Sequence, residues 1–321
     1  MSNDVLVVAE HLRGKLGDIT FEMLGHGKAL ARELGGACVV ALIGGSDAMT
    51  AELGAADRVV RVDGPGLDQF NPESHAAALA AVVAARQPRL VMVGYTSMGM
   101  DLATTLAVTA GMAQASSCLS VSVGSRTRVV SQLYGGKMLV TSDLGAGPCV
   151  VAMLAGAAPA EPGRAAGSPA VDTMAAPATA GRVRFKRLIE PEAGDVDITT
   201  QEVLVAIGRG IGKKEDVEVA EELADALGAA VAASRPLVDA GYLPRTRQVG
   251  KSGVKVAPKV YLALGISGAP EHIEGMKSSA TIIAVNTDKN APIFNVAHYG
   301  MVADLFDVCE ELTEAIKERK G

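Results

Sequence analysis

The sequence contains no tryptophan, and only 3% of its residues are aromatic, although 49% are hydrophobic. A core without large rings has to be built from Ala, Val, Leu and Ile, which is typical of parallel sheets covered by alanine-rich helices. No run of 18 or more apolar residues occurs, so no membrane-spanning helix is predicted. The net charge of −6 comes from interspersed acidic and basic residues, which argues against a nucleic-acid-binding surface.

Cysteine is also scarce, with four residues at Cys38, Cys118, Cys149 and Cys309. They form no C-x-x-C pair and have no histidine nearby in the sequence, so we expect reduced core cysteines and no metal site. The first predicted strand begins at Val5, which leaves no room for a signal peptide. These features predict a cytoplasmic protein.

Apolar runs with strand character alternate with helical patterns through the first 110 residues. The runs cover 5–9, 38–43, 58–62 and 90–93, and the helical patterns cover 28–34, 47–53, 74–86 and 101–110. This alternation predicts a parallel sheet with right-handed crossovers. Four later runs are divided by polar or glycine turns and are predicted as hairpin strands added to one edge of the sheet. They cover 119–123, 128–131, 138–141 and 149–154.

Residues 155–181 are rich in Ala, Pro and Gly and have no periodicity, so we expect a connection between two domains. The run 182–189 is a candidate for pairing with a sheet edge, and the domain break is expected near 190–199. The predicted domains are therefore residues 1–190 and 191–321. The α/β alternation then starts again, with strands at 203–207, 230–233, 261–264 and 281–285 and helices at 215–227, 270–277 and 305–320.

The stretch from Tyr261 to Asn286 reads as strand, glycine turn, helix and strand. The first strand ends at Gly265, and Pro270 suits the first turn of a helix, where no backbone donor is needed. This arrangement presents free backbone N–H groups to an anion, with His272 in the first helical turn. The glycines lack the full G-x-G-x-x-G spacing, so on this segment alone a simple tight turn explains them equally well.

Five polar features of the second half fall where open α/β sheets bind ligands, at the carboxyl ends of the strands. Each has an ordinary structural explanation on its own, but all of them in one domain favour a shared ligand of dinucleotide size. They are Arg209, Ser234 with Arg235, the loop 248–253, the turn 267–272, and Asn286 with Asp288.

The order GRG…SRPLVDAG…QVGKSG…YLALGISGAPEHIEGMKSSATIIAVNTDKNAPIFNVAHYG closely resembles the α subunit of electron transfer flavoproteins. The resemblance runs from about Leu204 to the C-terminus, and VLVVAEH, GYTSMGMDLATTLA and YGGK support it in the first half. It implies an α/β protein of two parallel-sheet domains. The N-terminal domain would be nucleotide-binding-like, with added antiparallel strands, and would contact a separate β subunit. The C-terminal domain would be Rossmann-like and bind FAD.

The resemblance also implies roles for individual residues. Arg235 would lie over the flavin ring, Ser252 would contact its polar edge, and His272 would lie near its pyrimidine side. A positive or donating group there stabilises the negative charge that reduction puts on the ring. Residues at the adenosine end would be Asn286, Asp304 and Leu305. The remaining cofactor-binding residues would be Arg209, Ser234, Gln248, Val249, Gly250, Lys251, Gly265, Ile266, Ser267, Gly268, Ala269, Pro270 and Glu271.

Four positions depart from the family pattern. Lys251 stands where most relatives carry glutamine, which adds a possible charge beside the flavin, and Ser252 replaces the commoner threonine. Met100 stands where a GRD segment usually has arginine, which weakens any inference about a β-subunit contact there. His298 replaces the commoner aspartate and is left out of the predicted site.

The function implied is that of an FAD-binding α subunit in a heterodimer, an electron carrier more than a substrate-converting enzyme. Its donors would be flavin dehydrogenases, such as acyl-CoA dehydrogenases, and its acceptor a membrane quinone oxidoreductase or another protein. One alternative is a subunit of an electron-bifurcating, NADH-dependent flavoprotein complex. Another is a nicotinamide-dependent oxidoreductase, which would need an acid/base pair that only His272 and Asp288 could supply.

Overall fold

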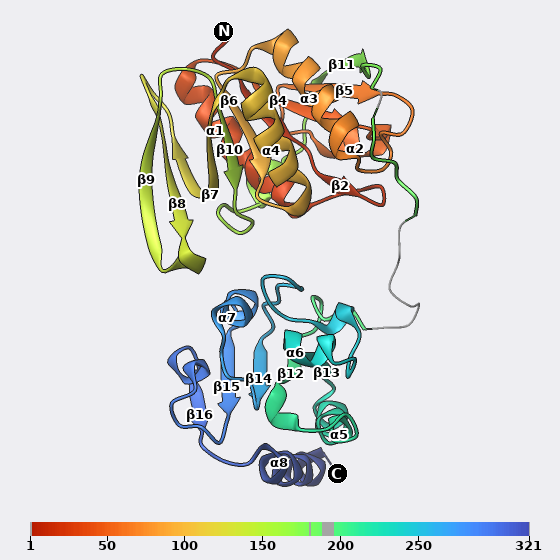
Figure 1. The fold of residues 1–321 in the computed structure, drawn as a ribbon, viewed down its shortest axis with the longest axis vertical. Helices are drawn as coiled ribbons and strands as arrows, with labels where there is room; N and C mark the ends of the chain where they lie inside the picture. The colour runs from red at the N-terminus through yellow and green to blue at the C-terminus, as the bar shows by residue number, and fades with distance from the viewer. Residues whose placement is uncertain (1, 180, 188–195, 321) are drawn as a thin grey trace. The chain divides into compact units, whose positions relative to one another are not determined.

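The structure is a computed structural model that describes residues 2–179, 181–187 and 196–320. The chain divides into two compact units, residues 1–187 and 188–321 (Figure 1). The boundary predicted after residue 190 lies outside the described residues.

A nine-stranded sheet forms the centre of the N-terminal unit. In spatial order its strands are β11 (Ala170–Ala175), β5 (Arg58–Asp63), β4 (Cys38–Ile43), β1 (Val5–Val8), β6 (Leu90–Gly94), β10 (Cys149–Met153), β7 (Ala113–Ser122), β8 (Thr127–Leu133) and β9 (Met138–Gly145). Neighbouring strands are parallel from β11 to β7, and β8 and β9 extend the sheet in the antiparallel sense. A small hairpin of β2 (His11–Leu12) and β3 (Lys15–Leu16) follows β1.

Helices cover both faces of this sheet (Figure 1). One aliphatic layer joins alternate residues of the strands to α1 (Asp18–Leu34) and α2 (Asp47–Glu52), and the other joins them to α3 (Pro72–Arg86) and α4 (Ser97–Ala110). Val5 and Val7 of β1 belong to the first layer, and Leu6 and Val8 to the second. A strand that is buried on both faces reads as a continuous apolar run, which is why β1, β4 and β6 were predicted as strands of the parallel sheet.

The structure corrects four expectations for the N-terminal unit. Residues 149–154 are not an edge hairpin strand, because β10 lies between β6 and β7 and is parallel to both. The segment 155–181 is not a plain connection, because it contains β11, which pairs with β5. The helical pattern expected at 28–34 is the second half of α1, which begins at Asp18. Residues 182–187 form no strand, and 188–189 lie outside the described residues.

The added strand β11 is anchored by charge as well as by backbone pairing. Asp172 accepts hydrogen bonds from the guanidinium of Arg58 at 2.8 Å and also pairs with Arg86. These arginines hold the pKa of Asp172 below its usual range. Backbone pairing with β5 and two arginines that meet Asp172 therefore hold β11 in place, and neither signal is carried by periodicity.

The C-terminal unit is built on a five-stranded parallel sheet. Its order is β13 (Ala230–Ala233), β12 (Val203–Ile207), β14 (Val260–Leu264), β15 (Thr281–Val285) and β16 (Tyr299–Met301). α5 (Val217–Leu227) and α8 (Leu305–Lys320) pack on one face through Leu223, Leu305 and Cys309. The other face is covered by α7 (Pro270–Met276) and by loop residues that include Val249 and Ile293. The short helix α6 (Arg235–Asp239) follows β13.

The predicted fold class, two α/β units with parallel sheets, is confirmed. All four cysteines are buried and unpaired with one another. Among the described helices, none combines the length and the apolar character needed to cross a membrane.

Candidate functional site

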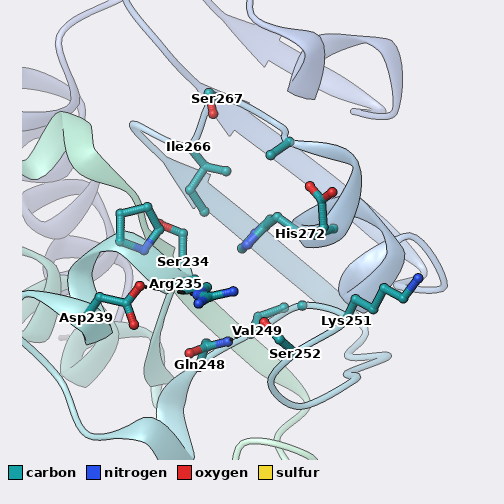
Figure 2. A pocket seen from close by; sticks show the side chains of 14 residues that line it. Ser234, Arg235, Asp239, Gln248, Val249, Lys251, Ser252, Ile266, Ser267 and His272 are labelled. Carbon is teal, nitrogen blue, oxygen red and sulfur yellow. Dashed lines mark hydrogen bonds and ion pairs between the residues drawn. The ribbon is translucent and has the colours of Figure 1, made fainter. Parts of the chain in front are cut away.

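A cavity of about 380 Å³ opens at the carboxyl ends of β13 and β14 in the C-terminal unit (Figure 2). Three segments build its wall: the start of α6, the loop around residue 250, and the turn that leads into α7. The lining residues are Ser234, Arg235, Pro236, Asp239, Gln248, Val249, Gly250, Lys251, Ser252, Ile266, Ser267, Ala269, Glu271 and His272. The volume lies in the range of ordinary ligand sites.

Arg235 stands at the mouth of this cavity. Ser234 follows the last residue of β13, and its backbone N–H donates to the carbonyl of Ile207 at 2.9 Å. Arg235 then opens α6, with Pro236 in the first turn. Its Nε donates to Asp239 at 3.2 Å, and the arginine side chain remains 65% exposed. Water screens such an exposed ion pair strongly, so the guanidinium can turn toward a ligand at little cost.

The loop from Gln248 to Ser252 is held at both ends by backbone hydrogen bonds. Val249 N–H donates to Ala233 O at 2.9 Å, and Lys251 N–H donates to Glu271 O at 2.8 Å. Nε2 of the buried Gln248 donates to the hydroxyl of Ser252 at 3.1 Å. This network fixes the Ser252 hydroxyl at the cavity wall. Figure 2 shows the exposed Lys251 side chain directed away from Arg235 and His272.

The turn between β14 and α7 depends on close backbone contacts. Gly268 has a φ of 87°, and a Cβ there would lie 2.2 Å from the backbone nitrogen of Ile293. Any other residue is therefore excluded by sterics as well as by conformation. The tight turn brings Ile266, Ser267 and Ala269 to the cavity wall before α7 begins at Pro270.

His272 enters the cavity wall from α7, across from Ser234 and Arg235 (Figure 2). The side chain is buried, and its Nε2 lies 2.9 Å from the hydroxyl of Tyr261. Its Nδ1 is buried and makes no hydrogen bond of ordinary geometry among the described residues, although the Val249 backbone is close enough to act weakly on the ring. Burial lowers the pKa of His272 to about 4, against a smaller opposing effect of the nearby Val249 backbone. At neutral pH the imidazole is therefore uncharged. Of the two roles expected for His272, a positive charge or a hydrogen-bond donor, this favours the donor.

Several predicted residues lie at the same sheet edge but do not line the cavity. Gly265 packs against the backbone of Gly210, where its Cβ would lie 2.7 Å from a Cα, and against Leu305. Asn286 Nδ2 donates to Ile266 O at 3.0 Å. Asp304 accepts the backbone N–H of Phe306 at 3.0 Å at the start of α8. The others outside the cavity wall are Arg209, which is exposed, Gly268 and Pro270.

Three residues of the site were missed in the sequence. Pro236 and Asp239 line the cavity, and Tyr261 lies behind it as the partner of His272. The i, i+4 spacing of Arg235 and Asp239 within a helix could have revealed their pairing. Nothing in the local pattern points to Tyr261, because it lies 11 positions before His272 on a different element. His298, which was left out of the site, accepts the backbone N–H of Ile282 at 2.9 Å.

A second hollow, of about 750 Å³, lies between α8 and the strands β14, β15 and β16. Its wall is mainly aliphatic, with Leu262, Ile283 and Ile316 among its residues, and its charged residues are Asp307 and Glu311. Two carboxylates repel a phosphate-bearing ligand, and no lysine or arginine among the lining residues offsets them, whereas Arg235 and Lys251 line the first cavity. The cavity around Arg235 and His272 is therefore the better candidate for a nucleotide cofactor.

Comparison with known proteins agrees with this location. A family model described as "Electron transfer flavoprotein domain" matches residues 5–179, and one described as "Electron transfer flavoprotein FAD-binding domain" matches residues 197–277. A relative named "Electron transfer flavoprotein subunit alpha" from Methylophilus methylotrophus is 39% identical over 313 residues, covering 96% of this chain and 97% of its own. The chain belongs to the electron transfer flavoprotein α-subunit family.

Other relatives agree. The protein of the same name from Bacillus subtilis is 32% identical and covers 99% of this chain and 98% of its own length. "Protein FixB" from Clostridium saccharobutylicum is 32% identical, with 98% and 96% covered. The role of this chain is that of an electron transfer flavoprotein, and its cofactor is FAD.

The residues present fit that cofactor. The matched FAD-binding segment contains the whole cavity wall. The wall combines the cation of Arg235 with hydroxyl groups. At Gly250, where φ is 143°, the absence of a side chain also lets the backbone come close to a ligand. The buried Nδ1 of His272 is a polar atom still without a partner among the described residues. An FAD molecule needs such groups for its carbonyl oxygens and its phosphates.

Proposed function

We propose that this chain is the FAD-binding subunit of a heterodimer and that the cavity around Arg235 and His272 receives the flavin ring. The observation that carries the proposal is the meeting of these two side chains, from different elements, at one cavity within the matched FAD-binding segment. FAD, when bound, accepts and releases electrons one or two at a time. All other groups in the site bind and orient it.

Each polar side chain of the cavity is then assigned a role toward the flavin. Arg235 supplies a positive charge that stabilises the added electrons, and it keeps that charge at any physiological pH. His272 supplies a neutral N–H donor, since burial holds its pKa near 4. Ser252, oriented by Gln248, offers a hydroxyl to the ring. Arg209, Asn286, Asp304 and Leu305 lie along the same sheet edge and are assigned to the phosphate and adenosine part.

The partner is inferred to be an electron transfer flavoprotein β subunit. Relatives that match almost the whole chain are named "subunit alpha", which supports a second subunit. We assign residues 1–190 to the contact with the β subunit and residues 191–321 to the binding of FAD. The donors are assigned as flavin dehydrogenases and the acceptor as a quinone oxidoreductase or a related protein, in the cytoplasm.

An electron-bifurcating complex is the alternative that the family resemblance implies, and the number of flavins per heterodimer distinguishes it. A nicotinamide-dependent oxidoreductase is not favoured. The cavity wall has no pair of close titratable groups for substrate acid/base chemistry, since its carboxylates Asp239 and Glu271 are exposed and the pKa of His272 is too low.

The test is to co-express this chain with the β-subunit gene of the same organism and to count flavins per heterodimer. We expect a yellow complex with FAD on this chain. Reduction by an acyl-CoA dehydrogenase with its substrate would establish the donor class. A colourless complex that binds nicotinamide nucleotides would overturn the proposal. A second flavin per heterodimer, with NADH oxidation, would select the bifurcating alternative.

A further inference from the structure

The buried pair of Tyr261 and His272 is the one side-chain pair at the site whose proton arrangement can be derived from its surroundings. Tyr261 is fully buried within the layer beneath α7. Its hydroxyl lies 2.9 Å from Nε2 of His272 and has no other hydrogen-bond partner among the described residues. The two rings are tilted, with centroids 6.1 Å apart. The phenol and the imidazole are therefore joined at one point, by one hydrogen bond.

Two arrangements of that hydrogen bond are conceivable. If Nε2–H donated to the phenol oxygen, the phenol proton and the acceptor Nδ1 would both be buried without a partner among the described residues, an arrangement that native proteins rarely contain. If the phenol donates to Nε2, its only donor is satisfied, and Nδ1–H alone is left without a partner among the described residues. A neutral imidazole carries one proton, so the proton must then lie on Nδ1.

The pKa shifts of the two groups favour the same arrangement, with a neutral phenol that donates to a neutral imidazole. Burial raises the pKa of the Tyr261 phenol well above its usual range, so the phenol stays protonated. Burial also lowers the pKa of His272, so the ring does not gain a second proton near neutral pH. Neither group changes its charge over the range in which the protein works.

We propose that Tyr261 is a positioning residue that holds His272 as the neutral Nδ1–H tautomer and closes its Nε2 to proton transfer. His272 then meets the cofactor as a hydrogen-bond donor and neither gives nor takes a proton. This inference rests on the proposed function only in that the flavin ring occupies this cavity. The state of the imidazole itself does not depend on FAD.

The experiment uses the full chain with its histidines labelled with ¹⁵N, with and without FAD, and reads the tautomer from long-range ¹H–¹⁵N correlations. The sequence has five histidines, so His272→Gln identifies the signals of His272. We expect one protonated nitrogen at Nδ1 and one unprotonated nitrogen at Nε2, unchanged between pH 5 and pH 8. Tyr261→Phe should give a mixture of tautomers and weaken FAD binding about fivefold, the loss of one ordinary hydrogen bond.

Tyr242→Phe is the matched control, because the Tyr242 hydroxyl donates to Gly212 O at 3.0 Å in the same unit, away from the cavity wall. It should leave the His272 signals and FAD affinity unchanged. A proton on Nε2 in the unaltered protein, or an unchanged Nδ1–H tautomer in Tyr261→Phe, would overturn the proposal. Failure of FAD to bind the unaltered chain with its partner would count against the proposed function and leave the tautomer result standing.

Discussion

Replacing Arg235 by alanine tests the electrostatic role of the site most directly. At a separation of roughly 5 Å and an effective dielectric constant of about 40, two unit charges interact by about 1.7 kcal/mol. Asp239 lies 3.2 Å from the guanidinium, and the arginine side chain is 65% exposed, so counter-charge and solvent reduce this value. We expect about 1 kcal/mol to remain, which corresponds to about 40 mV for one electron.

The assay is a spectroelectrochemical titration of FAD bound to the heterodimer. Arg235→Ala should lower the first-electron potential by about 40 mV and leave most FAD bound, because the loop 248–252 and the turn 265–269 remain. Arg235→Lys should restore only part of the shift, because an ammonium group is compact and cannot stack on a ring. Asp239→Asn should shift the potential in the opposite direction, since it removes the counter-charge.

Arg245→Ala provides the control for a simple loss of charge. Arg245 belongs to the 3₁₀ turn Arg245–Arg247 of the same unit and does not line the cavity. If Arg235→Ala and Arg245→Ala shift the potential equally, Arg235 acts only through the net charge of the protein. The assignment of Arg235 to the flavin ring would then be wrong.

Three further changes test other parts of the structure. Lys251→Gln should shift the flavin potential by less than Arg235→Ala, as measured in the same titration, because the lysine side chain points away from the cavity. Gly268→Ala should lower the free energy of unfolding in urea by about 2 kcal/mol or more. Gly228→Ala, whose Cβ would meet nothing within 4 Å, should cost only about 1 kcal/mol for its left-handed backbone. Burial raises the pKa of Glu10 in the folded state, so its stabilising protonated form is lost as pH rises through that pKa. Between pH 4 and pH 8 the urea midpoint should therefore fall more for the unaltered protein than for Glu10→Gln. Equal pH dependence would show that Glu10 titrates alike in both states.

The sequence predicted the strands better than their places in the sheet. β4, β12, β13 and β15 have the predicted bounds, because each is a buried apolar run that ends at glycine or a polar residue. β10 was assigned to the wrong part of the sheet. Its five residues are all buried, as expected for a central parallel strand, but it follows three hairpin strands in the chain. Local pattern gives the burial of a strand, whereas its neighbours depend on long-range packing.

The candidate site shows the same division. The carboxyl-end rule and the motif order brought together Ser234, the loop 248–252 and the turn 266–272, and these segments share one cavity wall. Charge states could not be obtained this way, because they depend on burial. His272 was expected to act as a positive or donating group, and its lowered pKa favours the donating role.

The neutrality of His272 makes Arg235 the more important charge at the cavity. The lining cations are Arg235 and Lys251, and the lysine side chain extends away from the others (Figure 2). The arginine is in turn paired with Asp239, at the exposed end of the wall. A side chain that is exposed and held only by an exposed ion pair can leave its partner when a ligand or a partner subunit covers it, and burial then strengthens its field. Formation of the heterodimer should therefore raise the flavin potential through Arg235, and that increase should be absent in Arg235→Ala.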